Sequence, residues 1–254
     1  MILAIDMGNS NIVIGCIDDN KSYFEERLST DKSQTALEYA IEFKSVLEIY
    51  HIDAKQIEGA IISSVVPPLT NIVKQAVEKI IGKSPLIVGP GIKTGLNLHM
   101  DNPKSVGSDL IVDAVAGITE YGAPLIVIDL GTATTMSVID KDRNYVGGSI
   151  MTGLRLSMEA LSSQAAQLFN VSLDVPNKAI GKNTTDCMKS GLVLGNAACI
   201  DGMIERMEEE LGYPTTVIAT GGLAQTVIPL CKHNILIDDS LLLKGLKIIY
   251  DKNR

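Results

Sequence analysis

Two segments of the chain combine an aspartate, a glycine and small polar residues directly after an apolar run. The first contains Asp6 and Gly8, and the second contains Asp129 and Gly131. A further apolar run follows each pair, which predicts a strand, a tight turn and a second strand. Such a turn exposes backbone N–H groups, its glycine lets the main chain approach a phosphate, and its aspartate can bind a cation or the waters around it. The two segments therefore predict two phosphate-binding turns.

A pair of glycines follows another apolar run late in the chain. A strand is predicted to end at Thr220, and Gly221 and Gly222 come between this strand and a predicted helix. Because these positions carry no side chains, a flat adenine or ribose can lie against the backbone near the N-terminus of the helix. An ordinary turn between a strand and a helix is the alternative. Combined with the two Asp-x-Gly turns, the glycine pair favours a nucleotide site.

The elements around these turns repeat. In the first half, periodicity predicts further strands at 23–28, 59–66 and 85–89 and helices at 35–50 and 69–82. In the second half, it predicts strands at 144–150, 215–220 and 234–238 and helices at 154–169, 184–211 and 240–253. Each half has the predicted order β-β-β-α-β-α-β, which indicates an old duplication. Two domains, 1–118 and 119–254, are expected to pack as lobes around one cleft.

Composition excludes several classes of protein. Apolar residues make up 46% and charged residues 20%, which is typical of a globular protein. The formal charge of −8 argues against nucleic-acid binding, which needs clustered Lys and Arg. The four cysteines lack the spacing of a zinc site and are expected to be reduced thiols. No signal peptide or membrane span is expected, which indicates a cytoplasmic protein with no membrane partner.

Several segments resemble those of type III pantothenate kinases, in the same order and with similar spacing. They are residues 6–11, 101–117, 127–135, 147–161, 180–191 and 217–224. The two turns and the glycine pair alone resemble the wider superfamily of actin, Hsp70 and sugar kinases. The resemblance implies an α/β protein with two duplicated actin-like (ribonuclease H-like) domains around a nucleotide cleft. It also implies ATP-dependent phosphorylation of pantothenate to 4'-phosphopantothenate, the first step of coenzyme A biosynthesis.

The resemblance also implies roles for single residues. Asp109 would be the general base that takes the proton from the primary hydroxyl of the substrate. Asp129 would bind a monovalent cation, K⁺ or NH₄⁺, and Mg²⁺ would accompany ATP. The nucleotide would be bound by Asp6, Met7, Gly8, Asn9, Ser10, Asn11, Ile12, Val13 and Thr132. Pantothenate would be bound by Gly107, Ser108, Asp109, Leu110 and Thr184. A homodimer with its contact in the second half is expected.

Two of these residues also have a purely structural interpretation. Asp109 precedes a predicted helix and could be its N-cap, since Asp is a favoured residue there. Thr184 likewise precedes a helix and could cap it.

The chain departs from the family pattern at two informative places. The usual Gly-Ala-Asp-Arg segment is here Gly107–Leu110, and leucine cannot make a charge-assisted bond to the carboxylate of a substrate. The second turn usually continues to an aspartate where this chain has Ser137. Two alternatives therefore stay open. One is a catalytically impaired paralogue that binds nucleotide or a pantothenate-like ligand and regulates a partner, and the other is a kinase acting on another small alcohol.

Overall fold

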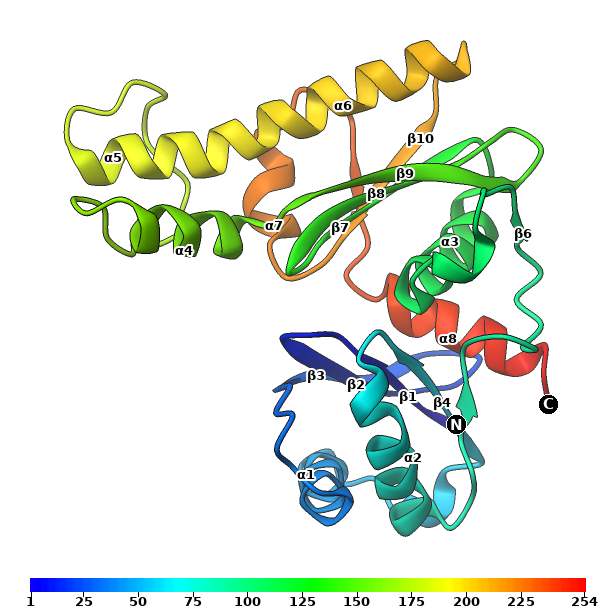
Figure 1. Ribbon diagram of the computed structural model, residues 1–254. Coiled ribbons are helices and arrows are strands. Elements are labelled where there is room, and N and C mark those ends of the chain that lie inside the picture. The colour runs from blue at the N-terminus through cyan, green and yellow to red at the C-terminus, as the bar shows by residue number, and fades with distance from the viewer. The chain divides into compact units, whose positions relative to one another are not determined.

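The computed structural model describes residues 1–254 and contains two compact units (Figure 1). The first unit comprises residues 1–96, 101–116 and 240–254, and the second comprises 97–100 and 117–239. Each unit is built on one mixed sheet. None of the helices is both long enough and apolar enough to cross a membrane.

The sheet of the first unit starts with an antiparallel meander. Its strands are β1 (Ile2–Met7), β2 (Asn11–Ile17) and β3 (Ser22–Ser29). The strand β4 (Gly59–Ser64) pairs in parallel with β1, and β5 (Leu86–Ile87) pairs in parallel with β4. Every residue of β1 is buried, as expected for a central strand that is covered on both faces.

Alternate residues of β1 pack into two different clusters. Leu3 and Ile5 pack with the helices α1 (Ala36–Ile49) and α2 (Pro67–Ile81). Ile2 and Ala4 pack on the other face, in a cluster with α3 (Ser108–Tyr121) and α8 (Leu241–Asp251). The period of two along the strand thus decides which helices each side chain meets.

Local sequence signals explain where the predicted helices begin and end. Thr35 and Glu38 form a capping box at the start of α1. Gly82 ends α2 with φ of 67°, a left-handed conformation that glycine adopts readily.

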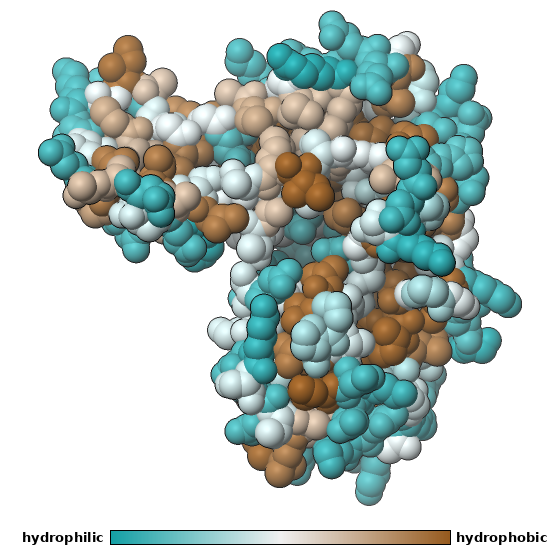
Figure 2. Space-filling model, in the orientation of Figure 1, coloured by the Kyte–Doolittle hydropathy of each residue, from teal (hydrophilic) through white to brown (hydrophobic).

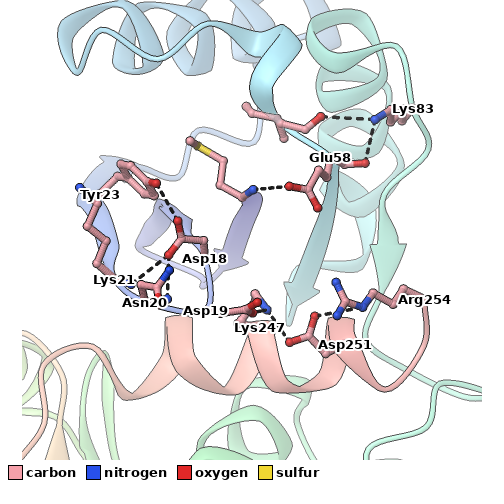
Figure 3. Close-up of polar contacts among 12 residues, drawn as sticks. Asp18, Asp19, Asn20, Lys21, Tyr23, Glu58, Lys83, Lys247, Asp251 and Arg254 are labelled. Carbon is pink, nitrogen blue, oxygen red and sulfur yellow. Dashed lines mark hydrogen bonds and ion pairs between the residues drawn. The ribbon is translucent and has the colours of Figure 1, made fainter.

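The C-terminal helix α8 belongs to the first unit. Lys247 is 11% exposed and donates hydrogen bonds to Asp19, at 2.5 Å, and to Asp251 (Figure 3). The sequence interpretation kept residues 119–254 in one domain, whereas the contacts group 240–254 with the first unit. The division at residue 118 stays a prediction.

The sheet of the second unit also starts with an antiparallel meander, formed by β7 (Leu125–Leu130), β8 (Ala133–Ile139) and β9 (Asn144–Thr152). The strand β10 (Thr216–Thr220) pairs in parallel with β7, and β11 (Leu236–Ile237) pairs in parallel with β10. The short strand β6 (Asn97–Leu98) adds an edge beside β9.

The second unit has four α-helices, and the longest of them packs on the sheet. They are α4 (Leu154–Gln164), α5 (Thr184–Lys189), α6 (Gly195–Leu211) and α7 (Ala224–Val227), with a π-helical segment at 190–194 joining α5 to α6. Ile200 and Ile204 of α6 pack with Ile126 and Ile128 of β7. The helices α4 and α5 and the start of α6 extend past the edge of the sheet (Figure 1).

The predicted duplication is confirmed by strand order. The first sheet runs β3-β2-β1-β4-β5, and the second runs β9-β8-β7-β10-β11 with β6 added outside β9. The second strand of each sheet even carries a register shift at the equivalent place, between Cys16 and Ile17 and between Val138 and Ile139. Asp6 and Asp129 each occupy the last position but one of the first strand.

Candidate active site

The first turn joins β1 to β2 and contains two residues between Gly8 and Asn11. The Gly8 N–H donates to the Asn11 carbonyl at 3.0 Å, which closes the turn. Asn9 and Ser10 are exposed at its tip. Met7 and Ile12 are fully buried in the core, so only their backbone groups can meet a ligand. Of the predicted nucleotide residues in this segment, Asn9, Ser10 and Asn11 are thus the ones with exposed side chains.

Thr30, just after β3, supports this turn from behind. Its hydroxyl donates to the Gly8 carbonyl at 2.7 Å, and its N–H donates to the Ser10 carbonyl at 3.0 Å. These contacts fix the carbonyl groups of Gly8 and Ser10. The sequence interpretation missed Thr30, because a threonine after a strand carries no signal of its own.

The neighbours of Asp6 are set by strand register. Asp6 is 8% exposed and is paired with Val13 on β2 and with Ser63 on β4. Ala4 and Ile61, two residues earlier on β1 and β4, share the cluster with α3 and α8. Asp6 and Ser63 therefore point to the face of the sheet that α3 covers.

The start of α3 is tied to the end of β4 by one hydroxyl. The Ser108 Oγ lies 2.9 Å from the Ser63 Oγ, accepts from the Ser64 N–H at 3.0 Å and lies 3.1 Å from the Ser64 carbonyl. Asp109 follows directly, and a Cβ at Gly107 would collide with the Asp109 Oδ1. The structure thus brings Asp109 to the strand ends that carry the first turn.

Asp109 is a carboxylate that forms no salt bridge, and the causes of its pKa shift include no nearby charge. Its Oδ1 accepts from the Leu110 N–H at 2.9 Å. Burial raises the pKa of Asp109, and the backbone N–H groups of Leu110 and of Asp109 itself oppose that rise. Because α3 begins at Ser108, Asp109 lies within its first turn, and the interpretation of Asp109 as an N-cap is wrong.

The second turn, between β7 and β8, is one residue shorter. The Gly131 N–H donates to the Ala133 carbonyl at 3.1 Å, which leaves only the exposed Thr132 at the tip. Gly153, after β9, packs so closely that a Cβ would overlap the carbonyl oxygens of Gly131 and Thr132. The second turn is therefore supported by glycine contacts instead of a threonine.

Two threonines flank Asp129 on the neighbouring strands. Asp129 is paired with Thr135 on β8 and with Thr220 on β10, so the three side chains start on the same face of the sheet. The Oγ1 of Thr135 is buried and has no hydrogen-bond partner within the protein. A carboxylate with neighbouring hydroxyl oxygens suits a hard cation. These residues fit the monovalent cation that the resemblance implies.

The glycine pair lies against this site. Gly221 has φ of 97°, and a Cβ there would collide with the Asp129 Oδ1 and with the backbone of Leu130. Asp129 and Gly221 are therefore brought together, as a nucleotide site in this unit requires. The helix α7 begins only at Ala224, later than the sequence suggested.

Three remaining positions differ in their surroundings. Thr184 is exposed at the first position of α5, and Asn183 is the N-cap, since its side chain accepts from the Asp186 N–H at 2.9 Å. The interpretation of Thr184 as a cap is therefore wrong.

The two departures from the family pattern lie in different surroundings. Leu110 is half-buried, and Ser137 is buried with its Oγ 3.1 Å from the hydroxyl of Tyr145. The serine thus fills a buried position in which an aspartate would need a partner for its charge.

The fold and the two turns define a class of protein: two duplicated actin-like domains, as in the nucleotide-binding ATPases and sugar kinases. The activator of the 2-hydroxyisocaproyl-CoA dehydratase from Clostridium difficile, solved with bound ADPNP, has this fold, with a TM-score of 0.57 and 10% identity over 99% of this chain and 94% of that one. The family described as "Type III pantothenate kinase" matches residues 2–206.

Two relatives match over their full length. A type III pantothenate kinase of Exiguobacterium sp. is 45% identical over 254 residues, which is 100% of both chains. A type III pantothenate kinase of Bacillus cytotoxicus is 43% identical over 253 residues, covering 100% of this chain and 97% of the relative. The chain therefore belongs to the type III pantothenate kinase family and is a kinase.

Proposed function

We propose that this protein transfers the γ-phosphoryl group of ATP to the primary hydroxyl of pantothenate, the first step of coenzyme A biosynthesis, with Asp109 as the general base. The observation that carries the proposal is the place of Asp109, partly buried beside the strand ends of the first turn. Phosphoryl transfer needs positioned reactants, neutralised charge and an acceptor for the proton of the nucleophile. A carboxylate with no cationic partner can take that proton.

The two turns would hold the nucleotide. The backbone N–H groups at the tip of the first turn are suited to phosphate oxygens, and Thr132 would add a contact from the second turn. Asp6 would hold Mg²⁺ or its waters, and bound Mg²⁺ neutralises phosphate charge. Gly221 and Gly222 would lie against the nucleoside.

Asp129 would hold the monovalent cation, K⁺ or NH₄⁺. The support is its position between Thr135 and Thr220, which offer oxygen ligands on both sides. There is no cluster of three or more His, Cys, Asp or Glu side chains that could hold a metal ion. A single carboxylate with hydroxyl groups suits a singly charged ion better than a divalent one, which usually takes more carboxylates.

Pantothenate would be bound by residues 107–110 and by Thr184. Leu110 offers no charge to the carboxylate of pantothenate, so the affinity for this substrate is expected to be low. A charge-assisted bond is typically worth about 1.5–3 kcal/mol, which is roughly ten- to a hundredfold in affinity.

A homodimer would form through the projecting part of the second unit. Five large apolar side chains there are exposed: Leu156, Leu161, Phe169, Val175 and Ile180. Figure 2 shows hydrophobic atoms, in brown, on this segment with α4 and α5. Exposed apolar groups on a helical projection are typical of a contact with a second copy. Light scattering would measure the mass, and a monomer at all concentrations would contradict the proposal.

We also propose a cytoplasmic location. All four cysteines are free thiols, and burial raises the pKa of Cys16 to about 12, which keeps this thiol protonated and unreactive. Free thiols are usual in a reducing compartment.

Coupled turnover with a panel of primary alcohols tests the proposed reaction. Pantothenate should be phosphorylated by Mg-ATP, and Leu110→Arg should lower the KM for pantothenate roughly tenfold while the KM for ATP changes little. Turnover of another alcohol in preference to pantothenate would favour the kinase with a different substrate. Nucleotide binding without turnover of any alcohol would favour the regulatory paralogue.

A further inference from the structure

The Ser108 hydroxyl is fully engaged in hydrogen bonds within the protein. It contacts the Ser63 Oγ, the Ser64 N–H and the Ser64 carbonyl, all within 3.1 Å. A hydroxyl has one donor and two acceptor sites, so these three contacts use its full capacity. Ser108 therefore has no hydrogen bond left for pantothenate, although the family resemblance places it in the substrate segment.

The partners of Ser108 are the residues aligned with the start of the first turn. Ser63 is paired with Asp6 and Ser64 with Met7, and the Val65 N–H continues this ladder by donating to the Met7 carbonyl at 3.0 Å. Ser63 is fully buried. Because β4 pairs with β1, which leads into the first turn, a shift of the Ser108 hydroxyl relative to β4 would also move it relative to that turn.

The chain that leads into α3 offers little other support. Residues 101–105 are exposed, so the segment before the helix is not packed into the core. The first buried apolar residue of α3 is Val112, one turn after Ser108. Ser108 is thus the point at which the start of the helix is fixed to the sheet.

We infer that Ser108 is a positioning residue. Its hydroxyl joins the first turn of α3 to the end of β4 and so holds the Asp109 carboxylate in register with the phosphate-binding turn. This inference rests on the proposed role of Asp109 as the general base. It changes the role of Ser108 from contacting the substrate to aligning the base with the nucleotide.

The variant Ser108→Ala tests the inference by removing only the hydroxyl. Alanine is smaller than serine and favours helices, so the variant is expected to fold with α3 intact. The single-turnover rate with both substrates saturating should fall about ten- to a hundredfold, since a displacement of about 1 Å can have that effect. The KM for ATP should change by less than about twofold, because the nucleotide contacts stay in place. The acid limb of the pH profile should move towards lower pH, because a loosened carboxyl gains water.

Two further variants keep the test specific. Ser63→Ala removes one partner of Ser108 and leaves both contacts to Ser64, so the rate should fall in the same direction but by less. Thr70→Val is the control, because the Thr70 hydroxyl contacts the Ser64 Oγ at 2.9 Å but not Ser108. It should leave the rate and the pH profile unchanged.

The outcomes separate the inference from the proposed function. If Ser108→Ala keeps the wild-type rate and pH profile while Asp109→Asn is inactive, the positioning role is wrong and the base assignment stands. A raised KM for ATP with an unchanged rate would also overturn the positioning role. If Asp109→Asn turns over at the wild-type rate, the base assignment itself is wrong.

Discussion

The two Asp-x-Gly turns share one topology but differ in what surrounds the aspartate. Asp6 lies between Val13 and Ser63, and Ser63 is engaged by Ser108. Asp129 lies between Thr135 and Thr220. Asp6 thus has an apolar side chain on one side and, on the other, a hydroxyl that is already hydrogen-bonded to Ser108, whereas Asp129 has a threonine hydroxyl on each side.

This difference would let a duplicated unit take on the two tasks proposed for the turns. The first turn is longer by one residue and is supported by Thr30, and the strand beside it, β4, is tied to Ser108, the residue before Asp109. This arrangement suits the proposed phosphate binding and proton transfer. The second turn is shorter, is crowded by Gly153 and Gly221, and has the hydroxyl oxygens that the proposed cation site would use. The two units share their strand order because of the duplication. The roles proposed for the two turns differ because single side chains differ at equivalent positions.

The largest expected effect separates the two aspartates. Asp129→Ala should lose the dependence of turnover on potassium together with about a hundredfold or more of the rate, because the charge that binds the cation is gone. Asp6→Asn should keep the ratio of rates in potassium and sodium while weakening the binding of Mg-ATP. Steady-state rates measured in potassium and in sodium, each at a series of Mg-ATP concentrations, give both the potassium dependence and the KM for Mg-ATP. Equal rates of the wild type in sodium and potassium would contradict the cation site.

An exchange of one neighbour sharpens the comparison. Thr135→Val removes a hydroxyl without changing the shape, and should raise the potassium concentration for half-maximal activity roughly tenfold. In sodium, the variant should melt at the same or a higher temperature, because the buried Oγ1 has no partner within the protein and leaving such a group unsatisfied costs about 1–3 kcal/mol.

The mirror variant is the control. Val13→Thr places a hydroxyl opposite Asp6, at the equivalent position of the first turn. It should leave the potassium dependence unchanged. If Thr135→Val has no effect on that dependence, the hydroxyl is not a ligand and the comparison of the two turns loses its main support.

The smallest expected effect concerns the support of the first turn. Thr30→Val removes the hydrogen bond to the Gly8 carbonyl but keeps the backbone contact to Ser10. One hydrogen bond contributes about 1 kcal/mol, so the KM for ATP should rise about three- to tenfold with little change in kcat. Calorimetric titration of ATP would check the change in affinity independently. A change in kcat alone would assign Thr30 to another role.

Much of this fold could be predicted from sequence because its signals are local. Apolar runs on either side of the Asp-x-Gly turns located the meanders, and the helices expected at 35–50 and 69–82 correspond to α1 and α2. Short edge strands were less predictable: the strand expected at 234–238 is only Leu236–Ile237, and β6 was not expected at all. Two-residue strands depend on a neighbour distant in sequence, so periodicity does not reveal them.

The site was only partly predictable for the same reason. Asp6, Asp109 and Asp129 were predicted from motifs, and their roles stay predictions. Strand register places Ser63 beside Asp6 and Thr135 beside Asp129, which no motif indicated. The contact between Ser63 and Ser108 could not be predicted from sequence, since the two residues lie far apart in the chain and meet only where the end of β4 lies against the start of α3. Caps at Asp109 and Thr184 were wrong because both helices begin earlier: α3 begins at Ser108, two residues before a helix capped by Asp109 would begin, and α5 begins at Thr184 itself, with Asn183 as the cap.

The role of Asp109 is tested most directly by the single-turnover rate of Asp109→Asn as a function of pH. Burial raises the pKa of Asp109, so the wild-type rate should fall as the pH drops through a value above that of an ordinary aspartate, which is about 3.9. The base must be deprotonated, so activity is present above that pKa and lost below it. The amide should bind ATP normally, lose about 10²–10⁴ in rate and lose this acid limb. A near wild-type rate with the acid limb intact would contradict the assignment of Asp109 as the base.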